Sequence, residues 1–390
     1  MATSLPGLNP EILKWARIRA GLSLGDVAAK LKKESSIIES WESGESAPTY
    51  LQLDELAYTI YKRPIALFFF PKPPDEPKPE QSFRTLPAFE LNNLESDTLY
   101  AIRQSQAMQL TLRELNEGIN PLAHNLFVEV SIGIDSNTIL SAATLRSYLG
   151  ISLSEQIEWI DTKTAFKRWR DAIQEKGIYV FKRPFKQKDI SGFCIFDQDF
   201  PVIYISNSTS ISRQIFSLFH ELSHILLKTN SLSKIDDSYI NDLSDKEKRI
   251  EFFCNRFAAD FLVPTEDFEK LSSQGPPFDN FIQESSRRYK VSREVILRKL
   301  LDKKKIDQKY YKLKVEQWTK EYEQEEKGKW GGGGNYYANV ANYLGNKFIN
   351  LAFNKYYNGR CSIEQLAVYL NIKVTNVPKF EHFVLDKAMI

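Results

Sequence analysis

The chain has 390 residues, of which 42% are apolar and 26% charged, so a disordered chain is excluded and two or three globular domains are expected. A net charge of +2 excludes a strongly basic nucleic-acid coat or an acidic tail as the organising feature. There is no apolar run of about 18 residues, no secretion-signal layout at the N-terminus, and the three cysteines are widely spaced. We therefore expect a cytoplasmic protein with no membrane partner.

Residues 1–70 have the pattern of a small helical bundle. Capping-box spacings, in which a hydroxyl residue is followed three positions later by an acid or amide, predict three helix starts: Ser23 with Asp26, Ser36 with Glu39, and Thr49 with Gln52. Apolar residues at helical spacing would form the core: Ile12, Trp15, Ile18, Leu22, Val27, Leu31, Ile37, Trp41, Leu53 and Leu56. Pro64 suits the first turn of a fifth helix. These features predict five short helices with a helix-turn-helix at about residues 24–42.

The string WESG at residues 41–44, with Pro48 downstream, is similar to the Xre/Cro-type helix-turn-helix family. The resemblance implies a homodimer that binds operator DNA through the second helix of the pair. The candidate DNA contacts are Lys30, Lys32, Lys33, Arg17 and Arg19 for phosphates, and Ser35 and Ser36 for base edges. That second helix has no basic residue, and residues 1–72 carry only nine basic and eight acidic residues. A bundle that binds protein or only dimerises is therefore the alternative.

A proline-rich tract predicts a linker and an anchor over residues 71–94. Its prolines favour an extended and semi-rigid chain. Phe83 and Arg84 follow the prolines and could anchor the linker on the next domain, although an ordinary surface arginine fits equally well.

Residues 95–305 are predicted to form one domain, which is helical at first and then contains a small antiparallel sheet. The strands are short β-rich runs separated by turn residues, at 177–181, 192–196 and 202–205. Helices are expected to follow at about 211–228 and 244–262.

The first of these two helices contains a His-Glu-x-x-His motif at His220, Glu221 and His224. Residues four apart share one helix face, so both imidazoles can reach one Zn²⁺ ion. Glu221 can hold and deprotonate a water molecule at the metal. A catalytic zinc site needs a third protein ligand. The second helix offers Glu251 as the better candidate, with two rivals, Glu247 and Asp260.

The run from the strands through FHELSHILL to EFFCNRFAADFLVP resembles the ImmA/IrrE family of zinc metallopeptidases, over roughly residues 160–305. The resemblance implies a zincin-like domain with Glu221 as general base. The zinc ligands that it implies are His220, His224 and Glu251. Asn255 matches the asparagine of the family's second motif, and we expect it to support the ligands from outside the coordination sphere.

Residues 306–390 are predicted to be a helical extension. It consists of a charged helix, four consecutive glycines from Gly331 to Gly334, and a tyrosine-rich tail. The glycines would serve either as a hinge or as part of a substrate groove. The expected fold is therefore mainly α with a small antiparallel sheet, an α+β protein made of a five-helix bundle, a zincin-like domain and this extension.

Together these features predict a zinc-dependent endopeptidase joined to a helix-turn-helix module. The resemblance implies that its protein substrate is a regulator, such as a repressor or an antitoxin-like protein, in a stress, mobile-element or toxin–antitoxin setting. The alternative is a non-proteolytic DNA-binding regulator, or an antitoxin-like protein that binds a partner toxin. The intact motif favours the enzyme, because a pure scaffold has no need of Glu221.

Overall fold

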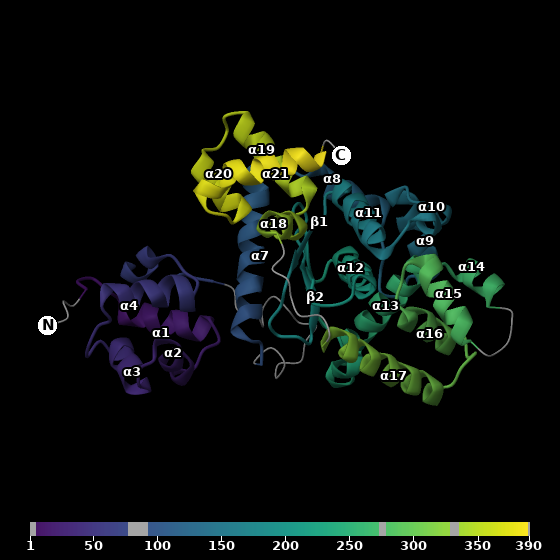
Figure 1. Ribbon diagram of the computed structural model, residues 1–390, viewed down its shortest axis with the longest axis horizontal. Coiled ribbons are helices and arrows are strands. Elements are labelled where there is room, and N and C mark those ends of the chain that lie inside the picture. The colour runs from purple at the N-terminus through teal and green to yellow at the C-terminus, as the bar shows by residue number, and fades with distance from the viewer. Residues whose placement is uncertain (1–4, 77–92, 273–277, 328–334, 389–390) are drawn as a thin grey trace. The chain divides into compact units, whose positions relative to one another are not determined.

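The computed structural model describes residues 5–76, 93–272, 278–327 and 335–388. The described residues form two compact units, one up to residue 106 and one from residue 107, and the division falls inside helix α7 (Ser96–Leu115). Both units are mainly helical, and the second also contains a small sheet (Figure 1). The predicted fold class is confirmed, while the domain boundaries expected at residues 70, 94 and 305 stay predictions.

The first unit contains short helices packed around an apolar core of their own. Its helical segments are α1 (Pro10–Arg19), α2 (Leu24–Leu31), α3 (Ser35–Ser43), α4 (Tyr50–Asp54), the π-helical turn η1 (Glu55–Ile60) and the 3-10 helix η2 (Ile65–Phe69). The capping boxes expected at Ser23 and Thr49 are present. The one expected at Ser36 is wrong, because α3 begins one residue earlier, after Glu34, which makes no side-chain cap.

The core of this bundle differs from the prediction at two isoleucines. Ile18 is 56% exposed and Ile37 is 36% exposed, although both were expected inside. Ile38 is buried instead, next to Trp41 in the apolar cluster. Apolar spacing places a helix start only to within a residue or two, which is enough to exchange two neighbouring isoleucines.

In the second unit, helices both precede and follow the strands of the sheet along the chain. Before the sheet come α8 (Pro121–Glu129), α9 (Thr138–Leu149), α10 (Leu153–Glu158) and α11 (Thr162–Glu175). The later helices are α12 (Ile211–Leu226), η3 (Asp237–Asp242), α13 (Asp245–Leu262), α14 (Thr265–Leu271), α15 (Asp279–Tyr289), α16 (Arg293–Asp302) and α17 (Gln308–Lys327). The C-terminal segment forms α18 (Tyr336–Leu344), α19 (Asn346–Tyr357), α20 (Ile363–Leu370), η4 (Val374–Asn376) and α21 (Val377–Ala388). None of the helices in the described ranges has both the length and the apolar character that crossing a bilayer requires.

The sheet is mixed, so the expectation of a purely antiparallel sheet is wrong. Its strands are β1 (Tyr179–Arg183), β2 (Ile190–Ile195), β3 (Val202–Ser206) and β4 (Ser231–Lys234), in the order β1-β3-β2-β4. Strand β2 is antiparallel to both of its neighbours, but β1 pairs with β3 in parallel. Strands adjacent in sequence usually pair, but β1 and β2 do not pair with each other, because β3 lies between them. The short, polar β4 was not predicted.

An aromatic cluster fixes the helices that carry the site. Trp169 of α11 meets Phe219 of α12 and Phe261 of α13 edge to face, with ring centroids 5.1 and 5.2 Å apart. Phe219 and Phe261 stack on each other at 4.1 Å. All three side chains are fully buried, and each contributes a large apolar area to the core. The cluster therefore holds α12 and α13 in one fixed arrangement beside the sheet (Figure 1).

Candidate metal centre

Helix α12 carries the His-Glu-x-x-His motif in the interior of the second unit. It begins after Ser210, whose hydroxyl oxygen accepts a hydrogen bond from the backbone N–H of Arg213. His220 and His224 are one turn apart and both are buried. Their Nε2 atoms are 3.2 Å apart. The spacing of the motif therefore brings the two imidazoles to one point, as predicted.

Helix α13 brings a carboxylate to the same point. Glu251 is fully buried, with Oε2 3.4 Å from Nε2 of His220 and Oε1 3.4 Å from Nε2 of His224. Within the described residues, these three side chains form the one cluster of potential metal ligands, with donor atoms all within 4.8 Å of one another. The residues proposed as ligands from the sequence thus meet in space.

The two rival carboxylates of α13 have other partners. Glu247 closes a capping box at the start of the helix, where it accepts hydrogen bonds from the backbone N–H and the hydroxyl of Ser244. Asp260 accepts a hydrogen bond of 2.8 Å from the buried ammonium of Lys299 and one of 2.7 Å from Thr138. Both carboxylates therefore serve to hold helices, which leaves Glu251 as the third candidate ligand.

The dimensions of this cluster fit a zinc ion. Four ligands at about 2.0–2.1 Å in a tetrahedron are separated from one another by about 3.3–3.4 Å. The observed separations of 3.2, 3.4 and 3.4 Å match this value closely. In addition, Oε1 of Glu251 is buried and has no hydrogen-bond partner among the described residues, as expected of an atom reserved for a metal. Two imidazoles and a carboxylate are a common donor set of catalytic zinc, with one position left open.

Neighbouring side chains orient the two imidazoles. Nδ1 of His220 lies 2.9 Å from the carbonyl oxygen Oδ1 of Asn255, which can only accept a hydrogen bond. Nδ1 therefore carries the proton and Nε2 presents its lone pair to the metal position. Nδ1 of His224 similarly lies 3.3 Å from Oγ1 of Thr229, whose hydroxyl donates to the backbone carbonyl of His224. Asn255 is placed as the resemblance implied, and Thr229 was not foreseen.

A tyrosine orients the carboxylate ligand. The hydroxyl of the buried Tyr239, in η3, donates a hydrogen bond of 3.1 Å to Oε2 of Glu251. Burial opposes the charge on Glu251, but positive charge on the adjacent His224 and His220 lowers the pKa of its carboxyl well below the usual range, and a metal cation held by neutral imidazoles would supply the same positive charge. Glu251 is therefore an anion ready to bind a cation. No local pattern in the sequence singles out Tyr239.

Glu221 has one engaged and one unengaged oxygen. Its side chain is fully buried, and the hydroxyl of Ser231 on β4 donates a hydrogen bond to Oε2. Oε1 has no hydrogen-bond partner among the described residues. Gly192 of β2 lies beside Glu221 and allows the close approach of β3, because a Cβ there would lie 2.7 Å from the carbonyl oxygen of Tyr204. Ser231 was missed because it lies on the strand that the sequence did not predict.

The residues proposed to contact DNA lie at the end of α2 and the start of α3. Lys30, Lys32, Ser35 and Ser36 are exposed, and Lys33 is half-buried. The two arginines are engaged within the bundle: Arg17 pairs with Glu42 of α3 at 2.7 Å, and Arg19 donates to the carbonyl of Glu76 at 2.8 Å. Fewer cations are therefore available for phosphates than the sequence suggested. Phe83, Arg84 and the glycines from Gly331 to Gly334 lie outside the described residues.

Comparison with known proteins matches the region of the chain that contains this cluster. Residues 173–301 match the IrrE N-terminal-like domain, the peptidase M78 family. The chain is 34% identical over 122 residues to the radiation response metalloprotease IrrE of Deinococcus deserti, covering 30% of this chain and 40% of that protein. It is 32% identical over 99 residues to the protein of the same name from Deinococcus radiodurans, covering 25% and 30% of the two chains. The match thus spans less than half of either curated relative. The chain contains an IrrE-like metalloprotease domain with a His-His-Glu site.

Proposed function

We propose that the protein is a zinc-dependent endopeptidase, with His220, His224 and Glu251 as metal ligands and Glu221 as general base. The observation that carries this proposal is the buried triangle of donor atoms from His220, His224 and Glu251, whose separations fit a tetrahedral metal. A further carboxylate, that of Glu221, lies next to His220 on α12. A purely structural site would not need Glu221, whose buried Oε1 has no partner among the described residues.

The chemistry divides between the metal and Glu221. Zinc, when bound, polarises the carbonyl of the peptide bond and makes a neighbouring water molecule more acidic. Oε1 of Glu221 takes the proton from that water as its oxygen attacks the carbonyl carbon. Glu221 then delivers the proton to the leaving nitrogen as the C–N bond breaks, so that the products are a carboxylic acid and an amine. Ser231 holds the other carboxylate oxygen during both transfers.

Ser231 should act as a positioning residue for Glu221. In Ser231→Ala, the carboxylate loses the hydrogen bond that fixes its rotamer, and kcat should fall about 10-fold with little change in KM. Ser231→Thr, which keeps a hydroxyl, should retain most of the activity. Steady-state kinetics on all three proteins tests this role. Equal kcat values in the wild type and Ser231→Ala would contradict it.

We propose that the substrate is a regulatory protein, such as a repressor or an antitoxin-like protein, in the cytoplasm of the host. The support is indirect: the two relatives are named for a radiation response, and a peptidase of narrow specificity suits a compartment full of other proteins. The test is to incubate the full chain with host proteins and to identify new N-termini by mass spectrometry. Cleavage of one or a few regulators should stop on chelation and return with zinc. No new termini, or cleavage insensitive to chelation, would refute the proposal.

We further propose that the first unit is a helix-turn-helix module that binds operator DNA as a homodimer. Its support is the pair α2 and α3, joined by a short turn with three lysines nearby. Arg17 and Arg19 are already paired within the bundle, so they are not available to contact phosphates. This favours either weak DNA binding or a protein partner such as a toxin. A gel-shift titration with upstream DNA decides: a salt-dependent shift supports the DNA role, and no shift at low salt excludes it.

A further inference from the structure

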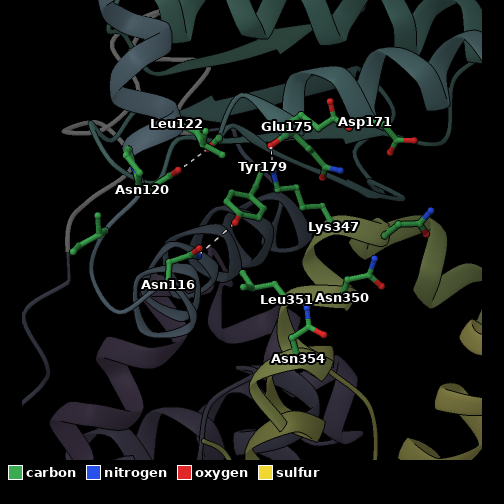
Figure 2. A pocket seen from close by; sticks show the side chains of 15 residues that line it. Asn116, Asn120, Leu122, Asp171, Glu175, Tyr179, Lys347, Asn350, Leu351 and Asn354 are labelled. Carbon is green, nitrogen blue, oxygen red and sulfur yellow. Dashed lines mark hydrogen bonds between the residues drawn. The ribbon is translucent and has the colours of Figure 1, made fainter. Parts of the chain in front are cut away.

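The second unit contains a groove of about 570 Å³ that the proposed chemistry does not use. One wall is a face of α19, from Asn346 to Asn354. The opposite wall is formed by the end of α7, the start of α8 and the C-terminal turn of α11, with Tyr179 of β1 (Figure 2). The α19 wall extends over nine residues of helix, or about 12 Å from the first Cα to the last.

The α19 wall is firmly attached to the rest of the unit. The buried guanidinium of Arg170 in α11 donates hydrogen bonds to the carbonyls of Asn342 and Tyr343, at 2.7 and 3.0 Å. Gly345 packs directly on this guanidinium with φ of +81°, and a Cβ there would lie 2.5 Å from the nearest Arg170 nitrogen. Lys347 donates a hydrogen bond of 2.7 Å to the carbonyl of Gln174. The two walls are therefore held at a defined separation.

The wall opposite α19 presents hydrogen-bonding groups in fixed orientations. The amide nitrogens of Asn116 and Asn120 already donate to protein acceptors, which leaves their carbonyl oxygens to accept. Gln174 is buried behind this wall, where its oxygen accepts from the backbone N–H of Val180 and its nitrogen is not accessible from the groove. The hydroxyl of Tyr179 accepts from Asn116 and can donate. The wall thus offers both acceptors and donors, as a peptide backbone requires.

The amides of α19 form a row along the groove. Asn346, Asn350 and Asn354 are four residues apart, so they share one face at intervals of about 6 Å. Figure 2 shows that Leu351 of this helix points toward Asn116 and Tyr179, while Asn350 and Asn354 flank it along the helix. Two residues of an extended peptide span about 6.6 Å. Successive amides of α19 can therefore reach alternate residues of an extended chain.

The charge of the groove and its apolar rim restrict which peptide sequences can bind. Asp171 and Glu175, one turn apart at the C-terminal end of α11, face a single lysine, Lys347, so the net charge is negative. The end of the helix dipole adds to this negative potential. Burial raises the pKa of Asp171, which indicates that water is partly excluded there. Ile119 and Leu122, exposed by 69% and 44%, supply apolar surface at the rim.

We propose that this groove binds an extended peptide segment of about four residues, with a lysine or arginine paired to Asp171 and Glu175 and apolar side chains beside it. The proposal goes beyond the peptidase function and does not depend on it. The backbone amides of the peptide would bond to the asparagine row and to the fixed groups of the opposite wall. The groove then serves as a docking site for a protein partner, separate from the residues at the metal.

The test is to select peptides that bind to the full chain. The Glu221→Gln variant is used, so that no bound peptide is cleaved. An array of short random-sequence peptides is probed, and the Kd of labelled hits is measured by fluorescence anisotropy. Asn350→Leu removes one amide of the row with little change in size. Asn358→Leu is the matched control, because Asn358 is exposed beyond the end of α19 and outside the groove. Glu175→Gln tests the charge.

The selected peptides should share a basic residue next to an apolar one. Asn350→Leu should raise their Kd about 10-fold, while Asn358→Leu leaves it unchanged. Glu175→Gln should weaken a lysine peptide more than the same peptide with glutamine in place of lysine. An array without hits, or hits whose Kd is the same in Asn350→Leu as in the parent, would overturn the proposal. Neither result would bear on hydrolysis at the metal centre.

Discussion

Replacing Glu221 by glutamine should abolish hydrolysis while leaving zinc binding intact. Glutamine keeps the size of the side chain and can still accept the hydrogen bond from Ser231, but it cannot take a proton. Loss of a general base typically lowers the rate by about 100- to 10,000-fold. The expected result is one zinc ion per chain by elemental analysis, together with the loss of zinc-dependent cleavage.

A matched variant separates this effect from general damage. Glu266→Gln makes the same change at an exposed position on α14 and should leave both zinc content and cleavage unchanged. Cleavage by Glu221→Gln at the wild-type rate would show that another residue serves as the base. Loss of zinc in Glu221→Gln would show that Glu221 holds the metal rather than the proton.

Replacing Glu251 by alanine should remove the zinc-dependent part of the protein's stability. A ligand at a thousandfold excess over its Kd stabilises the folded state by about 4 kcal/mol, which appears as a rise in Tm. Without Glu251, two imidazoles remain, and the zinc-induced rise in Tm should disappear. Thermal unfolding of the metal-free and zinc-loaded proteins measures this difference directly.

The rival carboxylate on the same helix provides the control. Glu247→Ala removes the capping box of α13 and should lower the Tm of the metal-free and zinc-loaded proteins by similar amounts. Its zinc-induced rise should therefore persist. If the rise were lost in Glu247→Ala and kept in Glu251→Ala, the assignment of the third ligand would be incorrect.

The core of the site was predictable because its parts are local. His220 and His224 converge through helix geometry alone, and the sequence of the second helix favoured Glu251 as the third ligand, with Glu247 and Asp260 as rivals. Setting aside the two rivals needed the tertiary structure, because Glu247 is engaged in capping and Asp260 in packing. The mainly helical class also followed from periodicity, which is a local property.

The supporting parts of the site were not predictable in the same way. Ser231 lies on a polar strand of four residues that has no β signal of its own, and it reaches Glu221 only because β4 pairs with β2. Tyr239 reaches Glu251 from a short 3-10 turn. The parallel pairing of β1 with β3 likewise depends on which strand occupies the centre of the sheet. Each of these contacts joins two segments that are separate in the chain, and neither segment's sequence indicates that it will contact the other.

X-ray absorption at the zinc edge of the purified wild-type chain tests the metal site most directly. We predict one tightly bound zinc ion with two imidazole nitrogens and a carboxylate oxygen at about 2.0–2.2 Å, and no sulfur neighbour. A chain that retains no zinc at neutral pH would contradict the account. So would a sulfur neighbour at about 2.3 Å, because a cysteine such as Cys254, on the same helix as Glu251, would then hold the metal.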